Sequence, residues 1–579
     1  MDMVNVKVNG IAVSVPKGST ILEAARAAGV EIPTLCFLKD INEIGACRIC
    51  VVEATGARGL VTACVYPVAE GMEIRTNTEK VQKCRRTTLE MILSTHEKKC
   101  LSCVRSGNCE LQKLCRDYGV EESSFEGYAP HYEPDTSCAH LVRNNNKCIL
   151  CRRCVAACKQ QFVSVIGAND RGIDTHIACA FEKDLADVPC ISCGQCINVC
   201  PTGALTERDD TDKVWAALAD PDKTVIVTTA PSVRAGLGES FGYPIGTNVE
   251  GQMVAALRRL GFDKVFDTDF AADLTIVEEA NELVQRMKNG GALPMITSCS
   301  PGWVKFAEYY YPEQLKNLST CKSPQQMAGA TIKTYYAEKM GIDPQNIVNV
   351  SVMPCTAKKF EIGRDDQAAA GVPDIDISIT TRELARMIER AGIRFTALPE
   401  EEFDSPLGED TGAALIFGAT GGVMEAALRT ANDWLTGKDN EDVDFTEVRG
   451  TAGLKEATYT IAGTELKVCV ASGAAAANYV MSRVKDGTAP WSFIEIMGCP
   501  GGCVNGGGQP IQPGYVRNTV DIKALRAKAL YDADKASKLR KSHESPVVKA
   551  LYAEYFDGFG GEKAHHILHT SYTARKKFR

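Results

Sequence analysis

Apolar and polar residues alternate at the start of the chain, where valines occupy every second position of VNVKV and flank Asn9-Gly10 together with IAVSV. Strict alternation around an Asn-Gly connection predicts a β-hairpin, because this dipeptide suits a two-residue turn. The next segment, 19–25, is expected to form a helix with Ser19 as its N-cap. With the cysteine-bearing loop that follows, these elements predict a small α+β unit over 1–80.

The middle of the chain is organised around cysteines. Residues 81–125 have a helical pattern and contain several cysteines and one histidine. Residues 126–209 carry two short cysteine runs of the same design, which indicates an internal duplication. We therefore expect two further small units before residue 210.

From about residue 210, short apolar runs alternate with helical segments over 210–579. This alternation predicts an α/β domain with largely parallel strands, followed from about 520 by a helical tail. Several runs end beside Cys299, Cys355 or Cys499, and open α/β sheets bind ligands at the carboxyl ends of their strands. The runs are TVIVTTA, KVFDTD, LPMITSC, NVSVMPC, IDISITT, ALIFGAT, LKVCVAS and SFIEIMGC.

Composition excludes several classes of function. The 579 residues carry a net charge of -8 without a Lys/Arg-rich run, so no nucleic-acid partner is expected. No apolar stretch approaches the roughly 18 residues of a membrane span, and the N-terminus lacks the pattern of a signal peptide. Of the 25 cysteines, 19 lie in residues 1–209. This distribution is unlike a secreted disulfide scaffold and predicts a cytoplasmic protein with a metal-rich N-terminal third.

The first cysteine group suits a [2Fe–2S] cluster, because each of the two irons takes two sulfur ligands. Its C-x2-C pair also occurs in structural zinc sites, which is the alternative. The group consists of Cys36, Cys47, Cys50 and Cys64.

The second group combines one histidine with three cysteines and is expected to hold a [4Fe–4S] cluster. A Cys3His zinc site is the competing interpretation. The four residues are His96, Cys100, Cys103 and Cys109.

The third group consists of two C-x2-C-x2-C-x3-C runs, the pattern of bacterial two-cluster ferredoxins, in which the fourth cysteine of each run ligates the other cluster. Lys159 replaces the usual proline after the first run. The spacing predicts one [4Fe–4S] cluster on Cys148, Cys151, Cys154 and Cys200, and another on Cys158, Cys190, Cys193 and Cys196. Four clusters in one chain indicate a relay of one-electron carriers that ends in the α/β domain.

Three motifs in the α/β domain carry a resemblance to a known family. They are TSCSPGW over 297–303, MPCTAKKFE over 353–361 and EIMGCPGGC over 495–503. Together with the preceding cluster motifs, they resemble the monomeric clostridial-type [FeFe]-hydrogenases over essentially the whole chain. The resemblance implies a two-lobed α/β catalytic domain with mostly parallel sheets, preceded by α+β ferredoxin-like iron–sulfur modules.

The family holds the H-cluster, a [4Fe–4S] cubane bridged by a thiolate to a di-iron unit with CO, cyanide and azadithiolate ligands. The resemblance implies that Cys503 is the bridging ligand and that Cys355 and Cys499 also ligate the cubane. Cyanide is anionic and needs hydrogen-bond donors, whereas CO needs apolar walls. The implied cyanide donors are Ser232, Lys358 and the backbone at Pro324 and Gln325, and the implied apolar contacts are Met353, Phe417 and Met497.

The chain departs from the family at Ser300, where the pattern has a cubane-ligating cysteine after the proton-donating Cys299. Adjacent residues of an extended segment point in opposite directions, so Cys299 does not easily serve both roles. Three arrangements stay open: the Ser300 oxygen ligates the cubane, Cys299 is recruited, or Cys321 approaches from another segment.

The resemblance also implies a proton route from Cys299 through Glu279, Ser319 and Glu282 to solvent. Glu279 and Glu282 stand three positions apart and therefore share one face of a helix. Without the flanking motifs, this acidic segment would be interpreted as a solvated helix face.

The implied reaction is reversible, 2H⁺ + 2e⁻ ⇌ H₂. The resemblance further implies a monomer that exchanges electrons with ferredoxin or a flavodoxin-type carrier. Maturation proteins would supply its di-iron unit. A strand followed by G-x-G-x-x-G is missing from the sequence, so this route to NAD is not expected. Three alternatives remain: a low-turnover hydrogen sensor, the catalytic subunit of an NADH-linked bifurcating complex, and an iron–sulfur assembly scaffold without a di-iron unit.

Overall fold

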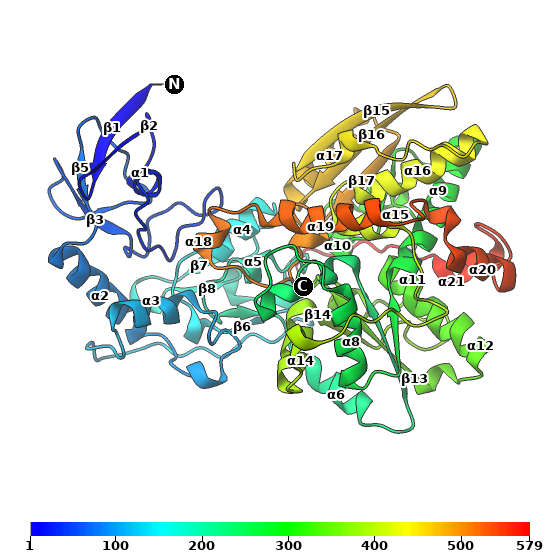
Figure 1. Ribbon diagram of the computed structural model, residues 1–579, viewed down its shortest axis with the longest axis horizontal. Helices are drawn as coiled ribbons and strands as arrows, with labels where there is room; N and C mark the ends of the chain where they lie inside the picture. The colour runs from blue at the N-terminus through cyan, green and yellow to red at the C-terminus, as the bar shows by residue number, and fades with distance from the viewer. Residues whose placement is uncertain (1, 579) are drawn as a thin grey trace.

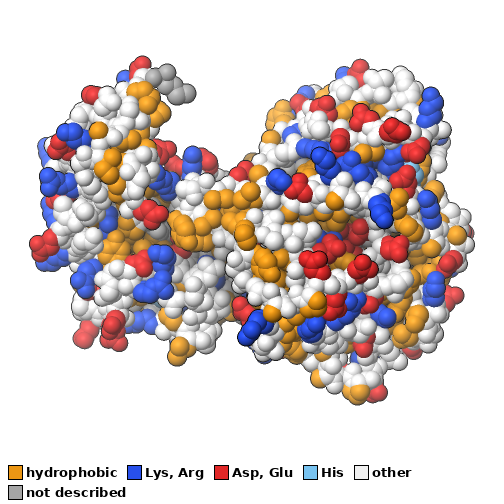
Figure 2. Space-filling model, in the orientation of Figure 1, with side chains coloured by type: hydrophobic (Ala, Val, Ile, Leu, Met, Phe, Trp, Pro, Cys, Tyr) orange, Lys and Arg blue, Asp and Glu red, His pale blue; other side chains and the backbone are white. Residues whose placement is uncertain are grey.

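The computed structural model describes residues 2–578. Small N-terminal modules lie at one end and a large α/β body at the other, with α4 (Arg153–Gln160) and α18 (Gly514–Arg517) between them (Figure 1). A notch separates the first module from the body on the face shown in Figure 2.

The first module is a five-stranded sheet in the order β2-β1-β5-β3-β4. The predicted hairpin is confirmed, since β1 and β2 pair antiparallel around Asn9 and Gly10, which both have positive φ as the tight turn requires. Ser19 was the wrong N-cap: Thr20 caps α1 and exchanges hydrogen bonds with Glu23, which stands at the spacing of a capping box. The elements are β1 (Met3–Val8), β2 (Ile11–Pro16), α1 (Ile21–Ala27), β3 (Val51–Ala54), β4 (Val61–Thr62) and β5 (Glu73–Arg75).

Two short helical modules follow. The first contains the predicted helices, α2 (Glu79–Ser94) and α3 (Glu110–Tyr118), whose apolar faces pack together. The second has two small antiparallel ribbons and two helices. They are β6 (Val142–Arg143) with β9 (Leu205–Thr206), β7 (Gly167–Asn169) with β8 (His176–Ala178), α4, and α5 (Gln195–Asn198).

The α/β body contains two four-stranded sheets, which confirms the predicted α/β fold with two lobes and mostly parallel strands. The first sheet is entirely parallel, in the order β11-β10-β13-β14. The second has the order β12-β17-β16-β15, and only its edge strand β15 is antiparallel. The strands are β10 (Thr224–Thr229), β11 (Lys264–Asp267), β13 (Ile347–Met353), β14 (Ile377–Thr380), β12 (Met295–Ile296), β15 (Leu454–Ile461), β16 (Thr464–Ser472) and β17 (Phe493–Met497).

One predicted strand was wrong. The run ALIFGAT forms the end of helix α15 (Gly412–Leu415) and a 3-10 turn, Ile416–Gly418. Short apolar runs do not distinguish a buried strand from a buried helix, and this one is fully enclosed. Gly418 permits the close approach, because a Cβ there would lie 2.4 Å from Leu530 and from the Ser232 hydroxyl.

The helical tail is confirmed as α19 (Ile522–Ala536), α20 (Pro546–Glu554) and α21 (Glu562–Leu568). Its last two helices pack on α9 (Asp269–Asn289) and α11 (Pro324–Thr331), as the shared core shows. Over residues 2–578, no helix combines the length and the apolar character needed to cross a membrane.

Candidate active site and metal centres

A single cavity lies where the carboxyl ends of both parallel sheets meet. Strand β13 leads into Cys355, β17 leads into Cys499, and β12 leads into Cys299. Strands of one direction deliver their following loops to one edge, so segments far apart in sequence converge there. Every H-cluster residue expected from the resemblance lines this cavity: Ser232, Cys299, Ser300, Pro324, Gln325, Met353, Cys355, Lys358, Phe417, Met497, Cys499 and Cys503.

The pKa values of the three cavity cysteines expected to hold a cluster are all raised. Burial raises the pKa of Cys355 and, to about 12, that of Cys503. Burial and then Cys355 raise the pKa of Cys499 well above its ordinary value. Thiols with raised pKa values keep their protons until a metal replaces them, so metal binding at these cysteines would release protons.

Ser300 faces the same cavity, but its hydroxyl is already engaged. The Gly498 amide donates to Ser300 Oγ at 3.0 Å, which leaves lone-pair capacity on the oxygen. Cys321 lies outside the lining of the cavity, and its sulfur faces Glu282 Oε2 at 3.8 Å. The geometry therefore opposes Cys321 as a replacement cubane ligand.

Lys358 is held by a buried carboxylate that the sequence analysis missed. Its ammonium donates to Glu361 Oε2 at 2.8 Å and to Ser323 Oγ at 2.7 Å. The same Glu361 oxygen accepts from Gln325 Nε2 at 2.9 Å and from the Ser323 hydroxyl at 2.9 Å. One oxygen thus orients several donors beside the cavity. Its place in MPCTAKKFE, one helical turn after Lys358, is the signal that could have revealed it.

The polar and apolar walls fit an inorganic group with anionic and neutral diatomic ligands. The Ser232 hydroxyl is fully buried and has no hydrogen-bond partner, which leaves a donor free for a bound acceptor. Met353, Met497 and Phe417 supply buried apolar surface. The donor set and the three thiols fit the group that the resemblance implies.

The residues expected to form the proton route, Glu279, Ser319 and Glu282, lie close together near Cys299. Burial, and then the charge of Glu282, raise the pKa of Glu279 to about 8. Neither Glu279 oxygen has a partner in hydrogen-bonding geometry, although the Ser319 hydroxyl and Ser298 amide lie close enough to oppose part of the rise. Ser319 Oγ donates to Glu282 Oε2 at 2.9 Å. Three of the expected relay residues are thus adjacent.

Cys299 lies at the cavity end of the expected proton route, and Arg286 lies at its outer end beside Glu282. Burial and then Glu279 raise the pKa of Cys299 well above its ordinary value. At the other end, Arg286 donates to Glu282 Oε1 at 2.6 Å. Arg286 was missed by the sequence analysis, although its place four residues after Glu282 on α9 indicates such a pair.

The four cysteines of the first module interact in two pairs, Cys36 with Cys47 and Cys50 with Cys64. Cys50 Sγ and Cys64 Sγ are 3.3 Å apart, and the Cys47 amide donates to Cys36 Sγ at 3.5 Å. Two pairs of thiols suit the two irons of a [2Fe–2S] cluster.

The histidine of the second group is available as a neutral ligand. Burial lowers the pKa of His96 to about 4, and its Nδ1 is buried without a partner. Cys103 Sγ lies so close to Gly203 that a Cβ there would be 2.7 Å from the sulfur. This module therefore packs tightly against the next.

The interleaved ferredoxin assignment corresponds to two separate cavities. One is lined by Cys148, Cys151, Cys154 and Cys200. The other is lined by Cys158, Cys190, Cys193 and Cys196. The fourth cysteine of each run thus lies with the first three of the other run.

Backbone carbonyls of cluster cysteines connect these centres. Asn42 Nδ2 donates to the carbonyls of Cys36 at 2.8 Å and Cys151 at 3.0 Å. Arg105 Nη1 donates to the carbonyl of Cys200 at 2.9 Å. The first two modules therefore both contact the cavity that contains Cys151 and Cys200.

Comparison with known proteins agrees with this architecture. Residues 223–507 match the model of the iron only hydrogenase large subunit, C-terminal domain. The chain is 48% identical over 590 residues to "NADP-reducing hydrogenase subunit HndD" of Solidesulfovibrio fructosivorans, with all of both chains covered. This chain belongs to the iron-only, or [FeFe], hydrogenase family. It is also 45% identical to "Iron hydrogenase 1" of Clostridium pasteurianum, covering 98% of this chain and 100% of the relative.

Solved [FeFe]-hydrogenases share the α/β body. A variant of HydA1 from Chlamydomonas reinhardtii is 39% identical, with a TM-score of 0.57, and covers 64% of this chain and 100% of its own. The hydrogenase interpretation from the sequence is thereby confirmed for the family, the fold and the enzyme class. The chain also resembles, at 30% identity, "Cytosolic iron-sulfur assembly component 3" of Rattus norvegicus over 67% of this chain and 83% of the relative.

The accessory parts of this hydrogenase match families of their own. Residues 1–79 match a 2Fe-2S binding domain, 85–124 an NADH-ubiquinone oxidoreductase-G iron-sulfur binding region, and 147–204 a 4Fe-4S dicluster domain. Residues 520–575 match the iron hydrogenase small subunit. Iron–sulfur binding by the N-terminal part is thus established, whereas the number of clusters and the domain limits stay predictions.

Proposed function

We propose that this hydrogenase catalyses the reversible reduction of protons to H₂ with electrons supplied by ferredoxin or a flavodoxin-type carrier. The convergence of three thiols, Ser300 and an unpaired Ser232 hydroxyl in one cavity, beside the buried carboxyl group of Glu279, carries this proposal. When bound, the di-iron unit supplies the iron site at which protons and electrons combine. Cys355, Cys499 and Cys503 would hold the cluster, and maturation proteins would deliver the di-iron unit.

The chain's own residues would move the proton. Cys299 would exchange it with the bound group, and Glu279, Ser319 and Glu282 would pass it to the surface. A carboxyl with a pKa of about 8 both binds and releases protons near neutral pH, as a relay requires. Ser319 would connect Glu279 with Glu282, because its hydroxyl donates to Glu282 and lies close to Glu279.

The electrons would follow a forked path. We assign one [2Fe–2S] cluster to the first module and three accessory [4Fe–4S] clusters to the next two. Both the first and the second module contact the cavity of Cys151 and Cys200. From there, the cavity of Cys193 adjoins the active-site thiol Cys499. Electrons could thus enter at the first or the second module and would leave through the cavity of Cys193 towards Cys499. We further propose that the chain functions as a monomer in the cytoplasm.

The decisive experiment is anaerobic infrared spectroscopy on protein matured with a synthetic di-iron cofactor, together with assays of H₂ evolution from reduced ferredoxin and from methyl viologen. Sharp CO and cyanide bands with H₂ evolution support the proposal. Bands without turnover would favour a hydrogen sensor. Missing bands in protein with intact iron–sulfur clusters would favour an assembly function.

A second candidate is a catalytic subunit in a nicotinamide-linked complex. It is favoured by the full-length similarity to a subunit of an NADP-reducing hydrogenase and by the small-subunit match at 520–575. Co-purification from the native cell distinguishes this subunit function from that of a ferredoxin-dependent monomer. A stable flavin-containing partner and NAD(P)H-dependent H₂ evolution would replace the monomer proposal.

A further inference from the structure

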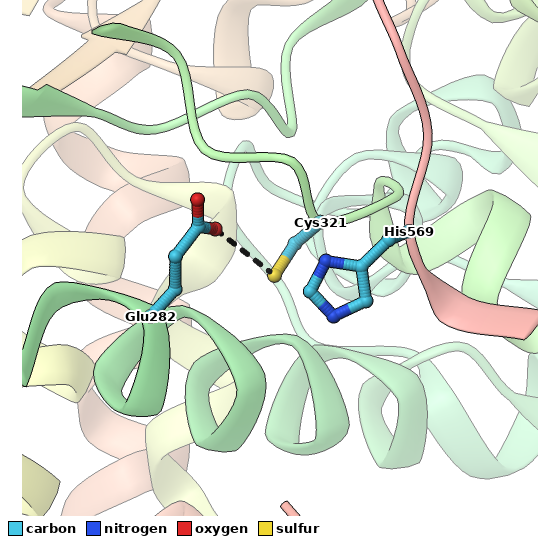
Figure 3. Close-up of side chains that lie close together, drawn as sticks. All are labelled: Glu282, Cys321 and His569. Atoms are coloured by element: carbon cyan, nitrogen blue, oxygen red, sulfur yellow. Dashed lines mark hydrogen bonds between the residues drawn. The ribbon is translucent and has the colours of Figure 1, made fainter. Parts of the chain in front are cut away.

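Three metal-ligating side chains from distant segments converge beside the relay: Glu282 of α9, Cys321 before α11, and His569 after α21 (Figure 3). One ligand atom of each lies within 4.8 Å of the others. Cys321 Sγ is 3.8 Å from Glu282 Oε2. Tetrahedral zinc has Zn–S bonds of about 2.3 Å and Zn–O bonds of about 2.0 Å, which place two such ligands about 3.5 Å apart.

Backbone hydrogen bonds fix the positions of two of these residues. Cys321 and His569 form an antiparallel β-bridge. The Lys322 amide donates to the Leu568 carbonyl at 2.8 Å, and the Thr570 amide donates to the Thr320 carbonyl at 2.7 Å. The two ligands are thus held by paired main chain, so little conformational entropy is lost when a metal binds.

A buried carboxylate orients the imidazole. Glu278 Oε2 lies 3.2 Å from His569 Nε2, and Glu278 is fully buried and also bonded by the Tyr552 hydroxyl and the Gly560 amide. A carboxylate that accepts from Nε2–H leaves Nδ1 free to bind the metal, as carboxylates hydrogen-bonded to zinc-ligating histidines do. Nδ1 at present contacts the Thr320 hydroxyl at 2.7 Å.

Carboxylates around the three side chains favour a bound cation, and the site is partly exposed to solvent. Glu278 and Glu282 provide carboxylates beside the site, and Arg286 donates to the other Glu282 oxygen. The side chains of Glu282 and His569 are 14% and 6% exposed, so the site lies just beneath the surface. The exposed His565 stacks on His569, with ring centroids 4.4 Å apart.

We propose that Glu282, Cys321 and His569 form a site for a divalent transition metal, represented by Zn²⁺, which caps the outer end of the proton relay. Mixed sulfur, nitrogen and oxygen donors exclude Mg²⁺ and Ca²⁺, which prefer oxygen, and suit zinc with one water as its fourth ligand. Binding would release the Cys321 thiol proton to the buffer.

The consequence of binding rests on the proposed function. Glu282 Oε2 is the atom that accepts the hydrogen bond from Ser319. Zinc on that oxygen would remove the proton acceptor of the last relay step and so inhibit H₂ evolution reversibly. A chelator would restore the original rate.

The test adds Zn²⁺ to anaerobic, fully loaded enzyme and records zinc K-edge X-ray absorption, which observes zinc separately from the resident iron. We expect one sulfur at about 2.3 Å and nitrogen or oxygen ligands at about 2.0–2.1 Å. Cys321→Ser should lose the sulfur contribution. Cys321→Ser and His569→Gln should each raise the zinc concentration for half-inhibition at least tenfold, normalised to their own zinc-free rates. His566→Gln is the matched control and should behave like the parent, because His566 is an exposed residue of α21, just before His569.

A zinc shell without sulfur, or equal zinc sensitivity in the parent and both variants, would overturn the site. The expected shell without inhibition would overturn the capping role. An enzyme that evolves no H₂ before zinc is added would contradict the proposed function, while the absorption spectrum would still test the metal site.

Discussion

The sulfur of Cys499 lies 3.8 Å from the carbonyl oxygen of Cys193. The first belongs to the active-site cavity and the second to the loop around a ferredoxin-type cavity. One-electron transfer between neighbouring carriers needs them close together, and this contact joins the two cavities across more than 300 residues of sequence.

Gly194 and Gly507 permit this approach, and Gly194→Ala tests it. A Cβ at Gly194 would meet the Thr356 hydroxyl at 2.5 Å and Gly507 Cα at 2.8 Å. We expect ferredoxin-dependent H₂ evolution to fall at least tenfold and stability to fall by about 1–3 kcal/mol, the usual cost of overpacking. Gly392→Ala is the control, because Gly392 also has positive φ but has nothing within 4 Å. Equal losses of activity in both variants would show that backbone strain causes the loss, and not the contact of Gly194 with Thr356 and Gly507.

Glu279→Gln should lower H₂ evolution by about 10²–10⁴-fold, the usual contribution of a positioned acid–base group. The amide retains the shape of the side chain but does not relay a proton. The infrared bands of the CO and cyanide ligands should keep their intensity, because Glu279 does not line the cavity. Turnover close to that of the parent enzyme would exclude Glu279 from the route.

The pKa of Glu279, about 8 in the folded state against an ordinary value of 4.5, predicts a sign for the pH dependence of stability. Between these two values the folded protein binds a proton that the unfolded chain has released, so this group makes stability fall as pH rises. Above about pH 8 the effect should level off. The stability difference between Glu279→Gln and the parent, measured from pH 5 to 9, should grow in favour of the variant over this interval, and a constant difference would contradict the assignment.

Ser300→Cys supplies a fourth thiolate beside Cys355, Cys499 and Cys503. If the Ser300 oxygen is the cubane ligand, this change from hard oxygen to sulfur should shift the reduction potential of the cubane. Ser300→Ala removes both the possible ligand and the acceptor of the Gly498 amide, so we expect a labile cubane. Potentiometric titration followed by electron paramagnetic resonance measures both effects. Identical potentials and iron content in all three proteins would show that residue 300 does not ligate the cluster.

Glu361→Gln should disturb the donors around the cavity while leaving the three thiols in place. The Glu361 carboxylate accepts from Lys358, Ser323 and Gln325 on one oxygen, and a neutral amide holds the ammonium less firmly. We expect shifted cyanide bands and a several-fold loss of activity. Glu401→Gln, a partly exposed carboxylate paired with Arg258, is the control and should leave the bands unchanged.

The sequence by itself determined the metal chemistry of this protein. The local spacing of cysteines in the two C-x2-C-x2-C-x3-C segments predicts iron–sulfur clusters, because short loops wrap around each cluster. The hairpin at Asn9-Gly10 and the alternation of strands and helices after residue 210 are likewise local patterns, and the structure has them.

Only the tertiary structure decided what depends on contacts between distant segments. It turned ALIFGAT into a helix and a turn, because complete burial between other elements overrides a short apolar pattern. In the structure, the Cys321 sulfur faces Glu282 and lies outside the cavity expected to hold the cubane. Glu361 accepts a hydrogen bond from the Lys358 ammonium. The tertiary structure also brought His569, from the last dozen residues, beside the relay on α9. No local spacing encodes such meetings, since they follow from how two parallel sheets and the C-terminal tail pack together.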